Sequence, residues 1–195
     1  QMDDRVLDLH IDLTRQDDGV IDGVRAVVPR RDAGPELDDA KDRAVLQRRA
    51  DLLEASGYQV DREYYVNDAG RQMNILAVSV WIRYLQGQGL DFPFPDNAYK
   101  GDYILDIAQR LSERFGSELG CSIEQLSEEL PLDESQGGDK EQYIDALIQR
   151  ARQLLGDRYQ DVFNQGLNAI VEDIREDLGE FGGHYNNWFS EASLS

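Results

Sequence analysis

The sequence predicts an α/β fold in which helices account for most of the residues. Two apolar segments near the N-terminus and an aromatic segment at 58–66 have the composition of strands. From Gly70 onward the apolar residues recur at helical spacing, which is typical of amphipathic helices. A strand that runs through a short polar turn into a helix, as at 62–86, is common in nucleotide-binding α/β enzymes.

The first 34 residues have the pattern of a β-hairpin. Residues 6–13 alternate apolar and polar side chains with a period of two, and residues 20–28 form a second apolar run. The intervening Gln-Asp-Asp-Gly at 16–19 has the composition of a turn. We therefore expect an N-terminal segment at 1–34, separate from a larger part at 35–195.

The next predicted elements are a helix, a strand and a second helix. The helix covers 35–56 with Gly57 as its C-cap, the strand covers 58–66, and the second helix runs from Gly70 to about Leu85. The Asn-Asp-Ala-Gly turn at 67–70 lies between the strand and the second helix. If this turn is purely structural, Asn67 or Asp68 is the expected capping residue of that helix.

The remainder is a mostly helical block. Glycines and prolines at 87–95 end the preceding helix, and Asp139 is the expected N-cap of a later one. The predicted elements are a helix at 101–115, a short helix at 123–130, a loop at 131–139, a helix from 140, a long helix at about 158–181, and a short strand or extended tail at 184–195.

The charge balance argues against one class of function. The chain has 39 acidic and 20 basic residues, and its net charge is -19. Proteins that bind nucleic acid on their own neutralise phosphates with a basic surface. Arg43, Arg48 and Arg49 form the densest basic group, but their predicted helix also carries several aspartates. The chain alone is therefore not expected to bind RNA.

Composition also bears on compartment and metal chemistry. The sequence has no apolar run of the roughly 18 residues that a membrane helix needs. Cys121 has no partner for an internal disulfide, which fits a reducing compartment. His10, Cys121 and His184 lie too far apart to form a metal motif, and no glycine-rich phosphate loop occurs. We expect a cytoplasmic, soluble protein without membrane contact, metal site or identifiable catalytic residue.

Acidic residues crowd the last long helix, at 173–180. We interpret them as a solvated acidic face, with a cation site as the alternative.

The turn at 67–70 is the best candidate for a ligand site. It follows a predicted strand, and open α/β folds bind ligands at the carboxyl ends of their strands. Asn67, Asp68 and Gly70 are the candidate residues of this turn. A structural turn with an N-cap explains the same residue types, so both interpretations remain open.

The segment LLEASGYQVDREYYVNDAGRQMNILAVSVWIRYL contains a strand pattern, an Asn-Asp-x-Gly-x-Gln turn and a following helix. In this order it resembles a segment of the arginyl-tRNA synthetases, a family of class I synthetases, and the resemblance covers residues 52–194. The similarity continues in the same order through FPDNAYKGDYILDIAQRL, GGDKEQYIDALIQRARQLLGDRYQDVFNQGLNAIVEDIREDLGEFG and WFSEASL.

The resemblance implies a partial Rossmann-like nucleotide-binding domain that carries a large helical insertion at about 87–182. It also implies a reaction in which ATP, with Mg, drives attachment of arginine to tRNA. Asn67, Asp68, Gly70 and Gln72 would be vestigial substrate-binding residues. Residues 1–34 have no counterpart in the family.

The sequence departs from the family at both of its signature motifs. After AGP at 33–35, where the family has His-x-Gly-His, this chain reads ELDDA. Carboxylates repel phosphate oxygens, so they do not replace the imidazoles. The 195 residues also contain no Lys-Met-Ser-Lys-Ser sequence.

Two functional hypotheses follow. In the first, the chain is a synthetase-like fragment or paralogue, inactive by itself, that works with a missing synthetase half. In the second, it is a non-catalytic interaction module derived from a synthetase, with a protein partner. Whether the chain acts as an enzyme stays open, and tRNA contact is implied by the resemblance only.

Overall fold

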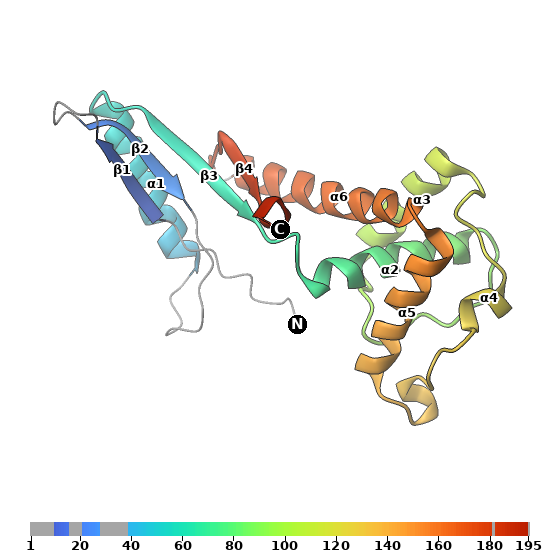
Figure 1. Cartoon of the computed structure of the whole chain (residues 1–195). Helices are drawn as coiled ribbons and strands as arrows, with labels where there is room; N and C mark the ends of the chain where they lie inside the picture. Colours follow the sequence, from blue (N-terminus) through green and yellow to red (C-terminus); the bar gives the residue numbers. More distant parts are fainter. Residues whose placement is uncertain (1–9, 16–20, 28–38, 181, 195) are drawn as a thin grey trace. The chain divides into compact units, whose positions relative to one another are not determined.

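The computed structural model describes the backbone of residues 10–15, 21–27, 39–180 and 182–194, and side chains from Gln47 onward (Figure 1). Helices dominate and the described strands form one small sheet, so the predicted helix-rich α/β class is confirmed. The chain divides into two compact units, one drawn from Gln1–Asp68 and Ile174–Ser195 and the other from Ala69–Asp173. The predicted boundary at 34/35 lies outside the described residues and stays a prediction. The limits of the predicted helical insertion, about 87–182, also stay a prediction.

The first unit contains a four-stranded sheet with the order β1-β2-β3-β4 (Figure 1). Its strands are β1 His10–Arg15, β2 Ile21–Val27, β3 Val60–Val66 and β4 Asn187–Ser190. The pair β1/β2 is antiparallel, whereas β2/β3 and β3/β4 are parallel. The short closing strand expected at 184–195 is thus present, and its partner is β3.

Helix α1, Asp39–Ala55, connects the parallel strands β2 and β3. Ala50 and Leu53 of α1 pack against Val60 of β3. Gly57 follows the helix with a φ of 91°, and the amide of Tyr58 donates to the Leu53 carbonyl at 3.0 Å. Gly57 thus forms the predicted C-cap. Because the amide of Tyr58 takes part in this cap, strand pairing begins at Val60, two residues later than expected.

An ion pair on β3 strengthens the contact with α1. The side chain of Arg62 is 11% exposed, and it donates to Glu54 at 2.6 Å and to Asp51 at 3.0 Å. The hydrogen bond from Arg62 holds the pKa of Glu54 below its ordinary value. The guanidinium group therefore has charged partners although little of it reaches solvent.

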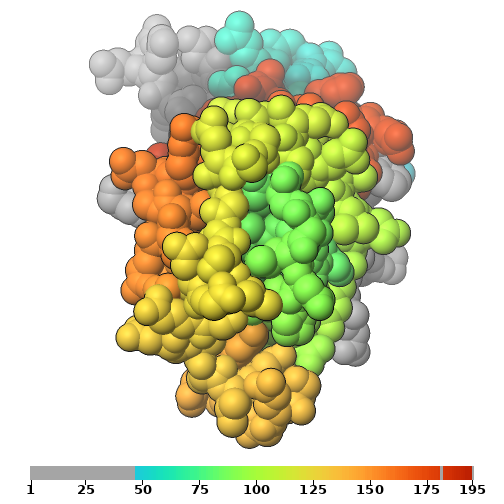
Figure 2. Space-filling view, turned by 90° about the vertical axis from the view of Figure 1, so that its right-hand side faces the viewer, coloured from blue at the N-terminus to red at the C-terminus, as the bar shows by residue number. Residues whose placement is uncertain are grey.

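The second unit is a helical assembly built around α2, Arg71–Gly87. Helix α2 buries side chains all around its circumference, which is the pattern of a central helix. It is surrounded by α3 Tyr103–Phe115, α4 Ile123–Ser127, α5 Lys140–Leu155 and the first part of α6 Arg158–Glu180. In the space-filling view, the segments that carry α3, α4 and α5 gather around the green segment that carries α2 (Figure 2).

Two large aromatic side chains of α2 belong to the core, as their helical spacing predicts. Trp81 is 0% exposed and donates from Nε1 to the Leu119 carbonyl at 2.9 Å, while the Tyr84 hydroxyl donates to the Gly116 carbonyl at 2.7 Å. Both polar atoms are therefore satisfied inside the unit. Helix α6 approaches α2 at Gly166, where an added Cβ would lie 3.4 Å from the Leu76 side chain.

The ends of several helices differ slightly from the sequence prediction. Helix α4 stops at Ser127 rather than near 130, because Glu128 is extended and Glu129 has a φ of 63°. The loop at 131–139 contains a single 3-10 turn, Glu134–Gln136. Helix α5 begins as predicted, because the Asp139 carboxylate accepts from the amides of Glu141 at 2.8 Å and Gln142 at 3.2 Å.

Replacing Asp139 by Ala is expected to lower the free energy of unfolding by about 0.5–2 kcal/mol, because two amides of the first turn lose their acceptor. Urea denaturation followed by circular dichroism measures the change. Asp91→Ala is the matched control, since Asp91 is exposed and lies outside the helices. Equal losses in the two variants would show that charge, not capping, decides the effect.

Candidate functional site at the carboxyl edge of the parallel strands

The carboxyl ends of β3 and β4 meet at one edge of the sheet. The strands are parallel, and the last residue of β3, Val66, pairs with the last residue of β4, Ser190. Asn67 and Asp68 follow β3, and Glu191 follows β4, so these side chains start from the same edge. This is the edge at which open α/β sheets bind ligands.

Asp68 is held inside the first unit. Asp68 is 5% exposed, and its carboxylate accepts from the Ser190 hydroxyl at 2.5 Å and from the Ala192 amide at 2.8 Å. The two oxygens thus have a donor each from the opposite chain segment. The sequence placed Asp68 among the ligand-binding candidates, but its carboxylate is occupied by contacts within the protein.

The neighbouring polar groups differ in exposure, and the Oε2 atom of Glu191 is buried. Asn67 is exposed, and Glu191 is half-buried in the short 3-10 helix η2, Glu191–Leu194. The Ser193 hydroxyl donates to the Ser190 carbonyl at 2.6 Å and closes the turn that joins β4 to η2. The edge therefore carries an exposed amide, from Asn67, and a half-buried carboxylate, from Glu191.

Aromatic packing fixes the two strands that carry these residues. Tyr64 stacks on Trp188 with ring centroids 4.6 Å apart, and Tyr185 meets Tyr64 edge-on at 5.5 Å. The Arg175 guanidinium lies 4.6 Å from the Trp188 ring centroid. Tyr65 and Phe189 stack at 5.9 Å as the next cross-strand pair. These rings pack against one another, as expected for the aromatic residues of β3.

Gly70 and Gln72, the remaining predicted site residues, lie in the second unit. Gln72 accepts a hydrogen bond from the Tyr99 hydroxyl at 3.1 Å. Gly70 is the N-cap of α2 with φ -79°, and no side chain caps this helix. The expectation that Asn67 or Asp68 caps α2 was therefore wrong. Asp68 turns to β4 and η2 instead, and Gly70 has no positive φ that would make alanine strained there.

Ser190 and Glu191 were missed by the sequence reasoning. A signal was available, because the strand-like NWF at 187–189 is followed by Ser-Glu, just as the aromatic β3 is followed by Asn-Asp. The direction and partner of the closing strand could not be read from its four residues. Its parallel pairing with β3 is what brings Ser190 and Glu191 to the same edge as Asn67.

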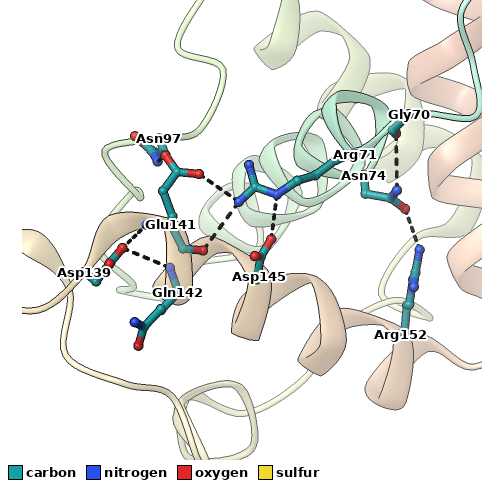
Figure 3. A network of polar contacts seen from close by, with 9 residues as sticks. All are labelled: Gly70, Arg71, Asn74, Asn97, Asp139, Glu141, Gln142, Asp145 and Arg152. Atoms are coloured by element: carbon teal, nitrogen blue, oxygen red, sulfur yellow. Dashed lines mark hydrogen bonds and ion pairs between the residues drawn. The ribbon is translucent and has the colours of Figure 1, made fainter.

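A second polar network, in the helical unit, has a structural explanation (Figure 3). Arg71 at the start of α2 forms ion pairs with Glu141 at 2.9 Å and Asp145 at 2.8 Å on α5. Asn74 accepts from Arg152 at 2.7 Å. These contacts connect α2 with α5, and each charged group has a protein partner.

Metal ligands do not gather in the described residues: no group of three or more histidine, cysteine or acidic side chains is close enough to hold an ion. Burial raises the pKa of the half-buried Cys121 thiol, which disfavours the reactive thiolate. Among the described helices none is long and apolar enough to cross a membrane.

Curated proteins similar to this chain are arginine–tRNA ligases. The ligase of Thioalkalivibrio sulfidiphilus is 57% identical over 147 residues, which cover 75% of this chain and 25% of that protein. The ligase of Hydrogenovibrio crunogenus is 55% identical over 152 residues, covering 74% and 26%. The ligase of Legionella pneumophila strain Paris is 51% identical over 144 residues, covering 73% and 24%. No family model matches the chain.

A solved structure supports the fold. A crystal structure assigned to an arginyl-tRNA synthetase of Campylobacter jejuni matches with a TM-score of 0.50 and 22% identity, covering 73% of this chain and 24% of the other. The chain thus spans about a quarter of the length of the relatives it matches. The resemblance inferred from the sequence is confirmed: over about three quarters of its length, this chain is homologous to a segment of the arginine–tRNA ligases.

Proposed function

We propose that this chain is a segment of an arginyl-tRNA synthetase-like protein, and that the carboxyl edge of β3 and β4 contributes to an arginine-binding surface. The proposal is carried by the position of Asn67 and Glu191 at the edge that parallel α/β sheets use for ligands. The parallel strands β2 and β3, connected by α1, support a partial Rossmann-like arrangement for the whole domain.

The chemistry of these two side chains suits arginine. The guanidinium group and the α-ammonium group are donors without acceptor capacity, and a carboxylate such as Glu191 is their strongest partner. The amide of Asn67 can donate to the ligand carboxylate. A chain with a net charge of -19 also attracts a cationic amino acid rather than repelling it.

The residue types of this chain do not suit adenylation, the step in which ATP activates the amino acid. Phosphate groups require preorganised donors, whereas the sequence after β2 places three carboxylates, Glu36, Asp38 and Asp39, where the family has His-x-Gly-His. The segment 28–38 lies outside the described residues, and the mismatch with phosphate is one of residue type. We therefore assign arginine contact, and not ATP chemistry, to the chain as it stands.

A protein-partner role, the alternative hypothesis, gains little from the described surface. The exposed large apolar residues are distributed over several elements and loops: Leu52, Tyr58, Tyr103, Leu105, Ile123, Leu132 and Leu194. Apolar side chains scattered in this way are ordinary on soluble proteins. The arginine proposal has the more specific structural support.

Arginine is expected to raise the melting temperature of the parent chain, because a ligand that binds only the native state stabilises it. Glu191→Gln and Asn67→Ala should reduce this shift, whereas Asp61→Asn should keep it, since Asp61 is exposed and lies within β3. Differential scanning fluorimetry measures the effect. Citrulline, which keeps the shape of arginine and its α-amino and α-carboxyl groups but lacks the guanidinium charge, is the ligand control for guanidinium recognition. An equal shift with citrulline, or none with arginine, would refute arginine recognition at this edge.

A further inference from the structure

Asp68 joins the end of β3 to the residues on both sides of Glu191. Its Oδ2 atom accepts from the Ser190 hydroxyl at 2.5 Å, and its Oδ1 atom accepts from the Ala192 amide at 2.8 Å. Ser190 immediately precedes Glu191 and Ala192 immediately follows it. The buried Asp68 carboxylate therefore contacts the residues on both sides of Glu191, the residue whose own carboxylate belongs to the edge.

We propose that Asp68 is a positioning residue: its carboxylate fixes the backbone on both sides of Glu191 and so sets the direction in which the Glu191 side chain leaves the carboxyl edge. The consequence for arginine rests on the proposed function. The constraint on the backbone follows from the hydrogen bonds alone and can be tested without a ligand.

The structure explains why this turn needs a polar anchor. Up to Ser190 the chain is held by pairing with β3 and by the stack of Trp188 on Tyr64. Beyond it, Ala192, Ser193 and Leu194 are exposed, with Leu194 at 70%, so apolar packing contributes little to holding η2. The Asp68 carboxylate therefore restrains the backbone where strand pairing and ring packing end.

A carboxylate suits this task better than the amide of asparagine. Both of its oxygens accept, so it can serve two donors at once, and a charged acceptor forms stronger hydrogen bonds than a neutral one. In Asp68→Asn one of the two oxygens is replaced by an NH₂ group, which donates. The Ser190 hydroxyl would then have to reorient so that it accepts this hydrogen bond. In Asp68→Ala both Ser190 and Ala192 lose their acceptor. Ser190→Ala removes one bond and leaves the other.

Amide hydrogen exchange of the full chain, followed by NMR, tests the constraint directly. We expect the Ala192 amide to exchange about tenfold faster in Asp68→Ala, in line with the loss of a charged hydrogen bond. Smaller increases are expected in Asp68→Asn and Ser190→Ala. Asp61→Asn should leave the Ala192 rate unchanged, and the buried amide of Leu147 on α5 reports that the helical unit remains folded.

Arginine titration by calorimetry, below the melting temperature of each variant, tests the consequence. Asp68→Ala and Glu191→Gln should each weaken binding about tenfold, and the double variant should bind no more weakly than Glu191→Gln alone. Residues that act through a common group are not additive, whereas a general loss of stability would add to the Glu191 effect.

The two hypotheses can fail separately. Failure of the parent chain to bind arginine would overturn the proposed function, and the exchange rate of Ala192 would still decide whether Asp68 positions the turn. An unchanged Ala192 rate in folded Asp68→Ala, or in Asp68→Asn and Ser190→Ala where the alanine variant does not fold, would overturn the positioning role. Additive losses of arginine affinity would also overturn it, because Asp68 would then act independently of Glu191.

Discussion

The 195-residue chain is expected to catalyse no measurable arginine-dependent exchange of pyrophosphate into ATP. The sequence contains neither His-x-Gly-His nor Lys-Met-Ser-Lys-Ser, the elements that stabilise charge on the transferring phosphates in class I synthetases. Loss of one preorganised donor of this kind costs on the order of a hundredfold or more in rate. The assay uses the purified chain with arginine, ATP, Mg and tRNA.

A full-length relative, such as the arginine–tRNA ligase of Thioalkalivibrio sulfidiphilus, provides the positive control for this assay. Arginine binding without exchange would support a segment that keeps part of the amino-acid site and lacks the groups for phosphate chemistry. Robust exchange by the pure chain would contradict the proposal and would require phosphate-binding donors other than the family's two motifs.

Trp81→Ala is expected to produce the largest loss of stability, lowering the free energy of unfolding by about 3–5 kcal/mol. The indole is 0% exposed at the centre of the helical unit, and its Nε1 atom donates to the Leu119 carbonyl at 2.9 Å. The substitution leaves a cavity between the helices and deprives a carbonyl of its donor. Urea denaturation followed by far-ultraviolet circular dichroism measures the loss.

Trp81→Phe separates the two contributions, since it keeps an aromatic ring and removes the hydrogen bond. Tyr103→Ala on α3 is the surface control, because Tyr103 is 40% exposed. Because the chain has two compact units, the transition should be fitted as two-state only where independent probes coincide. If the free energy of unfolding falls no more in Trp81→Ala than in Tyr103→Ala, the helices fill the space of the removed indole ring and the prediction is wrong.

Local signals predicted the helices well. The Asp139 cap, the C-cap at Gly57 and the apolar face of α3 were all readable, because each depends on residues within a few positions of one another. The N-terminus of α2 was misread for a related reason. Asn-Asp before a helix is a common cap, but the Asp68 carboxylate has two donors from a distant segment and turns to them.

The sequence showed only part of the polar carboxyl edge of β3 and β4. Asn67 and Asp68 could be nominated because they follow a strand of clear aromatic pattern, β3. Gly70 was nominated as part of the same turn, and Gln72 by the resemblance to the family's Asn-Asp-x-Gly-x-Gln motif. Both belong to the helical unit, where Gln72 contacts Tyr99. Glu191 was missed because no local pattern shows which strand β4 pairs with or in which direction.

The sequence by itself determined the relationship to the arginine–tRNA ligases, the predominance of helices, the acidic charge and the lack of both signature motifs. Each of these is a property of residue type, order or short-range spacing. The tertiary structure alone decided that β4 lies parallel to β3 and that Asp68 contacts a hydroxyl 122 positions away. Such pairings depend on how the aromatic faces and backbone donors of distant segments fit together, and neither composition nor local periodicity carries that information.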